Sequence, residues 1–214
     1  GRDRRKDQSY VLYQLTQRQL SHLLLPVGDY EKPDIRALAA EAGLENAEKA
    51  DSQDICFVPD GDYVGFLQRY GGVTPVPGDF VDQEGHVLGR HRGLECYTTG
   101  QRKGLGVSAD APLYVVRKDL DAGTVVLGPD SALYTDTLTA ERVNLISLSA
   151  LTGPIQVTAK TRYSQKEAEA IVEPLEGGRV RVTFAQPQRA VTAGQAVVFY
   201  DGEAVVGGGT ICGR

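Results

Sequence analysis

Apolar residues recur at helical spacing in the first part of the chain and at strand spacing in the rest. Residues 7–24 carry valine and leucine about three and four positions apart, and Pro26 stands just beyond them, which predicts one helix. A second helix is predicted from Pro33 to Gly43, because proline suits a first helical position and glycine the position past the last turn. A third, short helix is expected over about 62–69.

From Gly71 onward, short runs of β-branched residues alternate with turns rich in glycine, proline and aspartate, a pattern typical of β structure. Residues 113–117 and 125–127 predict a hairpin, and 147–154 is the best candidate for a linker. Beyond that linker, strands are expected at the even spacing of a small barrel or sandwich, at about 155–162, 168–174, 179–184, 196–200 and 204–211.

Composition is that of an ordinary globular chain. The 214 residues carry a net charge of −5, so any RNA contact must come from local basic patches. No apolar run approaches about 18 residues, the first residues are charged, and three cysteines are too few for a disulfide framework. We therefore expect a soluble protein of a reducing compartment, the cytoplasm.

One thiol stands in an unusual setting. Cys56 lies in the polar, acid-flanked stretch Asp51–Phe57, just before the turn residues Pro59-Asp60-Gly61. A cysteine kept for packing usually lies in an apolar segment, whereas a nucleophilic thiol needs access. On this pattern alone, a half-buried inert cysteine remains the alternative. Asp51 and Asp54 carry the wrong charge to favour a thiolate, so its activation must come from elsewhere.

The other cysteines carry no comparable signal. Cys96 is expected in a strand, and Cys212 lies two residues from the end. The cysteines are isolated, and the three histidines do not stand at the spacing of a structural zinc site. No metal site is predicted.

Motifs along nearly the whole chain resemble, in the same order, those of the tRNA-specific 2-thiouridylases. The matching segments include Lys6–Tyr10, Leu25–Gly28, Asp51–Phe57, Gly100–Gly106, Leu113–Val116, Lys160–Tyr163, Pro187–Thr192, Gly194–Tyr200 and Gly207–Gly209. The family's Ser-Gly-Gly-Val-Asp-Ser phosphate loop and its first catalytic cysteine have no counterpart in this sequence. The simplest expectation is that these residues are the C-terminal part of a longer enzyme.

The resemblance implies a fold and its domains. The expected fold class is mainly β with N-terminal helices (α+β), with a small central β domain followed by a C-terminal β-barrel. Residues 1–60 would form the helical tail of the catalytic domain, 61–146 the central β-rich domain, and 147–214 the barrel.

The resemblance also implies an activity, that of a tRNA-uridine 2-sulfurtransferase. It would convert the wobble uridine (position 34) to 2-thiouridine, using ATP and the sulfur of a persulfide carried on Cys56. ATP and Mg²⁺ would be bound by the missing domain, so the isolated chain is expected to bind no cofactor and to be inactive. The implied partners are tRNA (lysine, glutamate and glutamine acceptors) and a sulfur-relay protein or cysteine desulfurase, with no membrane.

Six residues are implied as tRNA contacts, namely Lys6, Asp7, Gln8, Arg162, Tyr163 and Gln195. Arginines precede Lys6, so the entrance to the first helix is basic. Arg162-Tyr163 pairs a guanidinium with a ring, which suits phosphate contact and base stacking. The structural alternatives are solvated charges at a helix start, a core tyrosine at a strand end and a simple polar turn at Gln195.

Two glycine-rich motifs remain. Gln101, Arg102 and Lys103 lie between glycines, which resembles a phosphate-cradling loop but not a nucleotide P-loop; a structural loop with solvated cations is the alternative. Gly207–Gly209 predicts a bulged or closely packed edge strand. The alternative function for the whole chain is a stand-alone β-barrel RNA-binding or adaptor module without catalysis, in which Cys56 is incidental.

Overall fold

The computed structural model describes residues 1–49, 57–58 and 61–213, so Cys56 lies outside the described residues. The chain divides into two compact units. Unit 1 comprises Gly1–Asp51, Asp136–Gln186 and Ala193–Arg214, and unit 2 comprises Ser52–Thr135 and Pro187–Thr192. The domain boundaries expected after residues 60 and 146 stay predictions.

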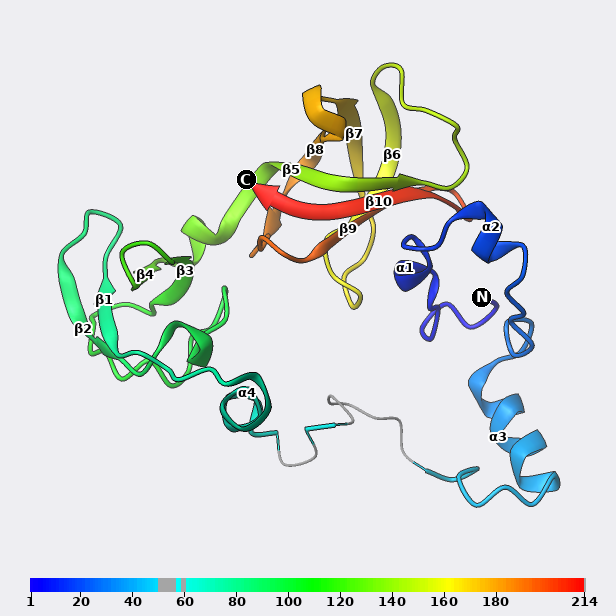
Figure 1. Ribbon diagram of the computed structural model, residues 1–214, viewed down its shortest axis with the longest axis horizontal. Helices are drawn as coiled ribbons and strands as arrows, with labels where there is room; N and C mark the ends of the chain where they lie inside the picture. The colour runs from blue at the N-terminus through cyan, green and yellow to red at the C-terminus, as the bar shows by residue number, and fades with distance from the viewer. Residues whose placement is uncertain (50–56, 59–60, 214) are drawn as a thin grey trace. The chain divides into compact units, whose positions relative to one another are not determined.

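Unit 1 is built on a closed barrel, in which β5 and β10 run across the view of Figure 1. Around the barrel the strand order is β10-β5-β8-β7-β6-β9. The strands are β5 (Tyr134–Leu145), β6 (Ile155–Lys160), β7 (Ala168–Pro174), β8 (Val180–Arg189), β9 (Ala196–Asp201) and β10 (Ala204–Gly213), and the 3₁₀ turn η3 (Glu176–Gly178) joins β7 to β8. The mainly β fold with N-terminal helices is confirmed, and so are the five strands predicted beyond residue 154.

The glycine run of β10 is packed closely, as the sequence predicts. The strand shifts register between Val205 and Gly207 and again between Gly208 and Thr210. A β-carbon on Gly207 would overlap the carbonyl oxygen of Asn144. The expected edge position is wrong, because β10 pairs with β9 on one side and β5 on the other, which a closed barrel requires.

Unit 2 holds a four-stranded sheet of order β2-β1-β4-β3. Its elements are β1 (Gly78–Val81), β2 (Val87–His91), β3 (Tyr114–Asp119), β4 (Thr124–Gly128) and the 3₁₀ turns η1 (Leu94–Cys96) and η2 (Asp130–Leu133). The predicted hairpin is confirmed as the antiparallel pair β3–β4. Phe80, Val115, Val125 and Leu127 are fully buried in the core of this sheet.

The prediction that Cys96 lies in a strand is wrong. Cys96 ends η1, whose preceding residue, Gly93, has φ 142° and so turns the chain out of extended structure. A β-carbon on Gly93 would come within 2.5 Å of Pro75, so the glycine is required here by both its backbone angle and its space.

The helices are α1 (Ser9–Leu12), α2 (Gln17–Leu20), α3 (Lys32–Glu41) and α4 (Tyr63–Gly71). The single helix predicted over 7–24 is wrong, because two short helices stand in its place. Thr16 and Gln19 form a reciprocal capping box that starts α2, and such a box favours a new N-terminus over a continued helix. The second and third predicted helices are confirmed as α3 and α4.

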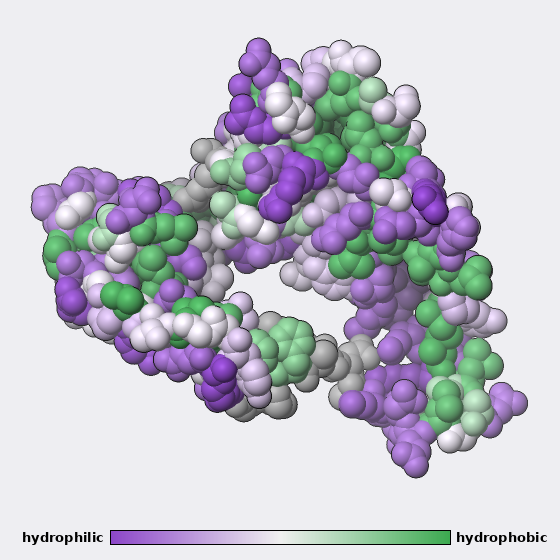
Figure 2. Space-filling model, viewed as in Figure 1, coloured by the Kyte–Doolittle hydropathy of each residue, from purple (hydrophilic) through white to green (hydrophobic). Residues whose placement is uncertain are grey.

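The apolar face of α3 is not covered. The helix has no buried residue, and its Leu38 is 47% exposed. Leu24 before the helix and Leu44 after it are also exposed, by 86% and 55%. Figure 2 shows this apolar surface in green at the lower right. Among the described residues, no helix combines the length and the apolar character needed to cross a membrane.

Candidate functional site

Unit 1 brings together residues from three distant parts of the sequence. The Gln8 side-chain amide donates a hydrogen bond to the Tyr163 hydroxyl at 2.7 Å. The Tyr163 ring meets the Tyr10 ring edge-to-face at 6.1 Å between centroids. The Tyr10 hydroxyl donates to the carbonyl of Ala196, the neighbour of Gln195, at 2.8 Å. Gln8, Tyr163 and Gln195 therefore belong to one surface, with Tyr10 beneath it.

Tyr10 was not predicted from the sequence as a site residue. It is buried together with Tyr13, Val198 and Tyr200, so it anchors the N-terminal segment on β9. Its only sequence signal is its place as the last residue of the Lys6–Tyr10 motif. Tyr163 and Gln195, by contrast, are exposed and can meet a ligand.

Asp7 shapes the start of α1. Its carboxylate accepts hydrogen bonds from the backbone N–H of Ser9 at 2.9 Å and from the Ser9 hydroxyl at 3.1 Å. Partial burial opposes ionisation, but these bonds and the Gly1 ammonium, 3.3 Å from Asp7 Oδ1, together hold the pKa of Asp7 below its usual range. A carboxylate that is ionised and used in this way repels phosphate, which suits a positioning residue better than a phosphate contact.

The two cations of the predicted contact set lie beside this surface. Lys6 is exposed two residues before Gln8. Arg162 directly precedes Tyr163, in a turn that the Gln165 side chain closes by accepting from the Thr161 hydroxyl at 2.7 Å. The positive charge of Arg162 also acts on the Tyr10 hydroxyl. Lys6, Asp7, Gln8, Arg162, Tyr163 and Gln195 all lie in unit 1.

The burial of Tyr10 predicts a stability change at high pH. Burial, with smaller contributions from Tyr13 and Tyr200, raises the pKa of Tyr10 to about 12 from the ordinary 10.0. Because the folded pKa is the higher one, this contribution to stability is present below about pH 10 and is lost as the pH rises towards 12. The melting temperature should therefore fall less steeply over this range in Tyr10→Phe than in the unsubstituted chain. Equal slopes in melting curves taken at intervals of half a pH unit would contradict this.

The Gly100–Gly106 loop belongs to unit 2. Arg102 and Lys103 are exposed there. Gln101 is half-buried, and its side chain is bonded within the loop. Its amide oxygen accepts a hydrogen bond from the Thr98 N–H at 3.0 Å, and its amide nitrogen donates to the Lys103 carbonyl at 2.9 Å. The structure thus separates the three predicted loop residues into two exposed cations and one internal brace.

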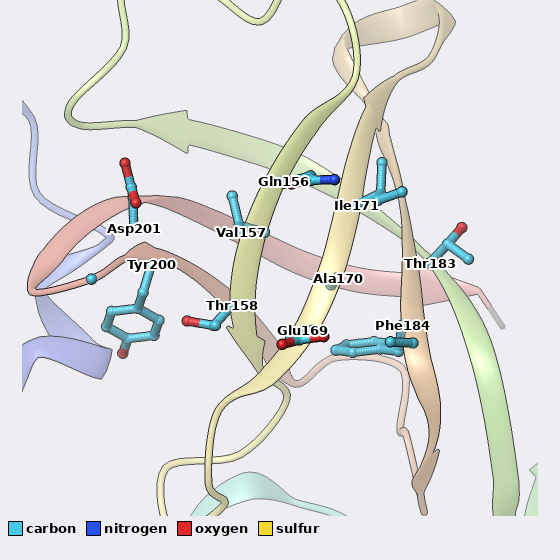
Figure 3. A pocket seen from close by; sticks show the side chains of 12 residues that line it. Gln156, Val157, Thr158, Glu169, Ala170, Ile171, Thr183, Phe184, Tyr200 and Asp201 are labelled. Carbon is cyan, nitrogen blue, oxygen red and sulfur yellow. The ribbon is translucent and has the colours of Figure 1, made fainter.

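A cavity of about 500 Å³ opens on the β6–β7–β8 side of the barrel (Figure 3). Its lining includes the carboxylates of Glu169 and Asp201 but no lysine or arginine. None of the predicted site residues lines it. Without a cation or a glycine-rich phosphate loop, this cavity does not fit the triphosphate of ATP, and we derive no step through ATP at the described residues.

One group of side chains in unit 2 has the composition of a metal site. The ligand atoms of Asp82, Glu84 and His86 lie within 4.8 Å of one another on an exposed turn. The Asp82 carboxylate accepts a hydrogen bond from Nδ1 of the His86 ring at 2.9 Å, and this bond raises the pKa of His86. Protonation removes the lone pair that a metal needs, so this pairing disfavours an ion, and the expectation of no metal site stays a prediction.

The described thiols are both free. Cys96 is half-buried in unit 2, and Cys212 is exposed in β10, with its Sγ 3.5 Å from the Thr139 carbonyl oxygen. The assignment of Cys56 as the reactive cysteine stays a prediction.

Comparisons with known proteins match the chain in three consecutive parts. Residues 1–60 match a tRNA methyl transferase HUP domain, 64–129 a tRNA methyl transferase PRC-barrel domain, and 135–211 an aminomethyltransferase β-barrel domain. These descriptions place a β-barrel family over the strands that close the barrel of unit 1.

Several similar relatives are named tRNA-specific 2-thiouridylase MnmA. The relative from Acetivibrio thermocellus is 54% identical over 206 residues, covering 96% of this chain and 57% of its own length. The relative from Heliobacterium modesticaldum is 54% identical, over 99% of this chain and 55% of its own length. The relative from Halothermothrix orenii is 49% identical, over 99% of this chain and 59% of its own length. The chain thus spans little more than half the length of these relatives. Three domain matches in order, with relatives about half identical over nearly every residue, identify the chain as a member of the tRNA-specific 2-thiouridylase family.

Proposed function

We propose that these residues are part of an enzyme that converts the wobble uridine of tRNA, at position 34, to 2-thiouridine. The observation that carries the proposal is the unit 1 surface, where Gln8, Tyr163 and Gln195 meet through Tyr10. Such a convergence of residues about 155 positions apart (Gln8 and Tyr163) is what a binding surface requires. The name of the similar relatives, tRNA-specific 2-thiouridylase, supports a role in the 2-thiolation of tRNA.

The surface has the chemistry of an RNA contact. Lys6 and Arg162 supply positive charge for phosphates, the exposed Tyr163 ring can stack on a base, and Gln8 and Gln195 offer amide donors and acceptors. Asp7 fixes the start of α1 through Ser9 and so holds Gln8 in place. The net charge of −5 gives no general attraction for RNA, so the contact depends on this local arrangement.

In the proposed reaction Cys56 carries the transferred sulfur as a persulfide. The terminal sulfur forms a bond to C2 of the uridine as the activated C2 oxygen leaves. A second thiol then attacks the sulfur atom of Cys56 and forms a disulfide with it. The bond between Cys56 and the terminal sulfur breaks, and that sulfur stays on C2 of the uridine. Activation of the oxygen needs ATP and Mg²⁺, which we assign to a part of the enzyme outside these residues, as we do the second thiol. A sulfur-relay protein or cysteine desulfurase would load Cys56.

Binding of unmodified tRNA to this chain tests the surface. Arg162→Ala and Lys6→Ala should each weaken binding roughly fivefold at ~0.1 M salt and lower the slope of affinity against salt by about one, because each removes a phosphate contact. Fluorescence anisotropy with labelled transcript over a series of KCl concentrations gives both values.

Lys118→Ala is the matched control. Lys118 is an exposed cation of β3 in unit 2, whose amine donates to the Leu94 carbonyl. If this substitution weakens binding as much as the other two, the contact is a diffuse charge effect and the unit 1 surface is not the site. Binding that survives all three substitutions would count against the proposal in the same way.

A further inference from the structure

The Gly100–Gly106 loop of unit 2 has a fixed shape. Gly100, Gly104 and Gly106 adopt φ of +89°, +76° and +68°, a region that strongly favours glycine. The loop is tied to β3, since the Gly100 N–H donates to the Val115 carbonyl at 2.8 Å and the Val115 N–H donates to the Gln101 carbonyl at 2.9 Å. With the Gln101 side chain bridging Thr98 and Lys103, the loop is braced at both ends.

The brace leaves two cations at the tip of the loop. Arg102 and Lys103 are exposed, and neither forms an ion pair with any residue of the described ranges. Two adjacent cations without a carboxylate partner attract an anion more strongly than paired ones do. They stand on a loop of defined shape rather than on a free chain end.

A third cation, Arg189, lies against the same loop from about 85 residues further along the chain. Its Nε and Nη2 donate to Asp130 Oδ1 at 3.1 and 2.9 Å, and its guanidinium lies 5.4 Å from the centre of the Tyr114 ring. A β-carbon on Gly100 would come 3.5 Å from Arg189 Nη1 and 3.2 Å from the Ala190 β-carbon. The guanidinium is therefore held in one orientation, with Nη1 towards the loop.

The backbone beside Arg189 is also held in an uncommon conformation. Ala190 has φ 54°, in a region that residues with a side chain rarely adopt. Its N–H donates to the Leu133 carbonyl at 2.8 Å, which stabilises the turn. A β-carbon at position 100 would make a tight contact of 3.2 Å with the Ala190 β-carbon, so glycine favours this close approach of the turn to the loop.

We propose that Arg102, Lys103 and Arg189 form a phosphate-binding corner on unit 2, and that its ligand is the phosphodiester backbone of RNA. The loop supplies two exposed charges, and Arg189 a planar donor group suited to phosphate oxygens, held by Asp130 with Nη1 towards the loop. Gln101, Asp130 and Tyr114 are positioning residues. The inference rests on the proposed function, to which it adds a second contact region. A free nucleotide or pyrophosphate presents the same phosphate chemistry and is the competing source.

The test measures tRNA affinity for three variants as a function of KCl concentration. The double substitution Arg102→Ala/Lys103→Ala should lower the salt slope by about two and the affinity by more than tenfold at ~0.1 M salt, and Arg189→Ala should lower the slope by about one. Arg90→Ala is the control, because Arg90 is also an exposed arginine of unit 2 paired with an aspartate, Asp79, at 2.8 Å. It should leave both values unchanged.

A fourth variant separates binding from folding. Arg189→Lys keeps the charge but loses the two-nitrogen bond to Asp130 and the stacking on Tyr114, so it should recover the salt slope and only part of the affinity. Circular dichroism of every variant should match the unsubstituted chain. If Arg189→Ala is unfolded, the result rests on the loop double variant, whose side chains are exposed and unpaired in the described ranges.

The outcomes distinguish the two proposals. Loss of tRNA binding in Arg162→Ala and Lys6→Ala, with unchanged binding in the loop variants, overturns the phosphate corner and leaves the proposed function standing. No binding of tRNA by the unsubstituted chain overturns both. Calorimetric titration with ATP and with pyrophosphate is the second arm: binding of either that disappears in the loop double variant assigns the corner to a free nucleotide and overturns the RNA assignment.

Discussion

Replacement of Cys56 by serine is expected to abolish thiolation of tRNA, with a loss on the order of 10³-fold or more, while tRNA affinity stays within about twofold. Serine is nearly the same size, but its oxygen cannot carry a transferable sulfur. The assay requires the whole enzyme, which can be assembled by joining this chain to the N-terminal portion of the Acetivibrio thermocellus relative, 54% identical over the shared part. Thiolated tRNA is separated on mercury-containing gels and counted.

Cys96→Ser and Cys212→Ser are the matched controls. Both thiols are free, and both lie outside the family's cysteine segment, so each substitution should leave at least about half of the activity. Substantial thiolation by the Cys56→Ser enzyme would assign the sulfur to another carrier. It would also favour the alternative function, an RNA-binding module in which Cys56 is incidental.

Replacement of Gly207 by alanine is expected to lower the free energy of unfolding of unit 1 by about 3 kcal/mol, a typical cost of overpacking a tight site. The new β-carbon would overlap the Asn144 carbonyl oxygen and lie 3.0 Å from the Leu145 Cα. Both are backbone atoms of β5 and cannot move aside without disturbing the β5–β10 pairing. Urea denaturation followed by circular dichroism gives the difference.

Gly213→Ala is the control in the same strand. Its β-carbon would meet the Thr139 side chain at 3.9 Å, an ordinary contact. Neither Gly207 nor Gly213 has a positive φ, so the two substitutions differ in the space available and not in backbone strain. A change below about 0.5 kcal/mol is expected for Gly213→Ala. Similar losses for both would mean that the close approach of β10 to β5 does not limit the barrel.

The strands were predictable because the sequence encodes them locally. Alternation of apolar residues between glycine-rich turns is a short-range signal, and all five strands beyond residue 154 follow it. The single helix predicted over 7–24 failed because a periodic apolar pattern does not show where a helix restarts. The Thr16–Gln19 capping box was visible in the sequence as Thr-x-x-Gln, and it carries the information that the periodicity lacks.

The candidate site was predictable only as a set of separate motifs. Resemblance pointed to Gln8, Tyr163 and Gln195, but nothing local shows that Tyr10 joins them, because its bond to Ala196 spans 186 positions. Gln101 was grouped with its cationic neighbours because composition does not reveal where an amide points. Arg189 received no role for a related reason, since its contacts with Asp130 and Tyr114 depend on how the sheet of unit 2 is assembled.

The chain's interleaving of the two units has a consequence for the order in which they form during synthesis. The sheet of unit 2 lies within one continuous stretch, from Gly78 to Gly128, so it can assemble while later residues are still being made. Unit 1 must wait, because β10 pairs with both β5 and β9 and Tyr10 docks beside Ala196. Contacts of such large sequence separation form slowly, and nascent chains fold as their segments emerge. We therefore expect α1, which carries Tyr10, to stay undocked on the ribosome until β9 and β10 have emerged, so that a segment made long before these strands reaches its native place only after them.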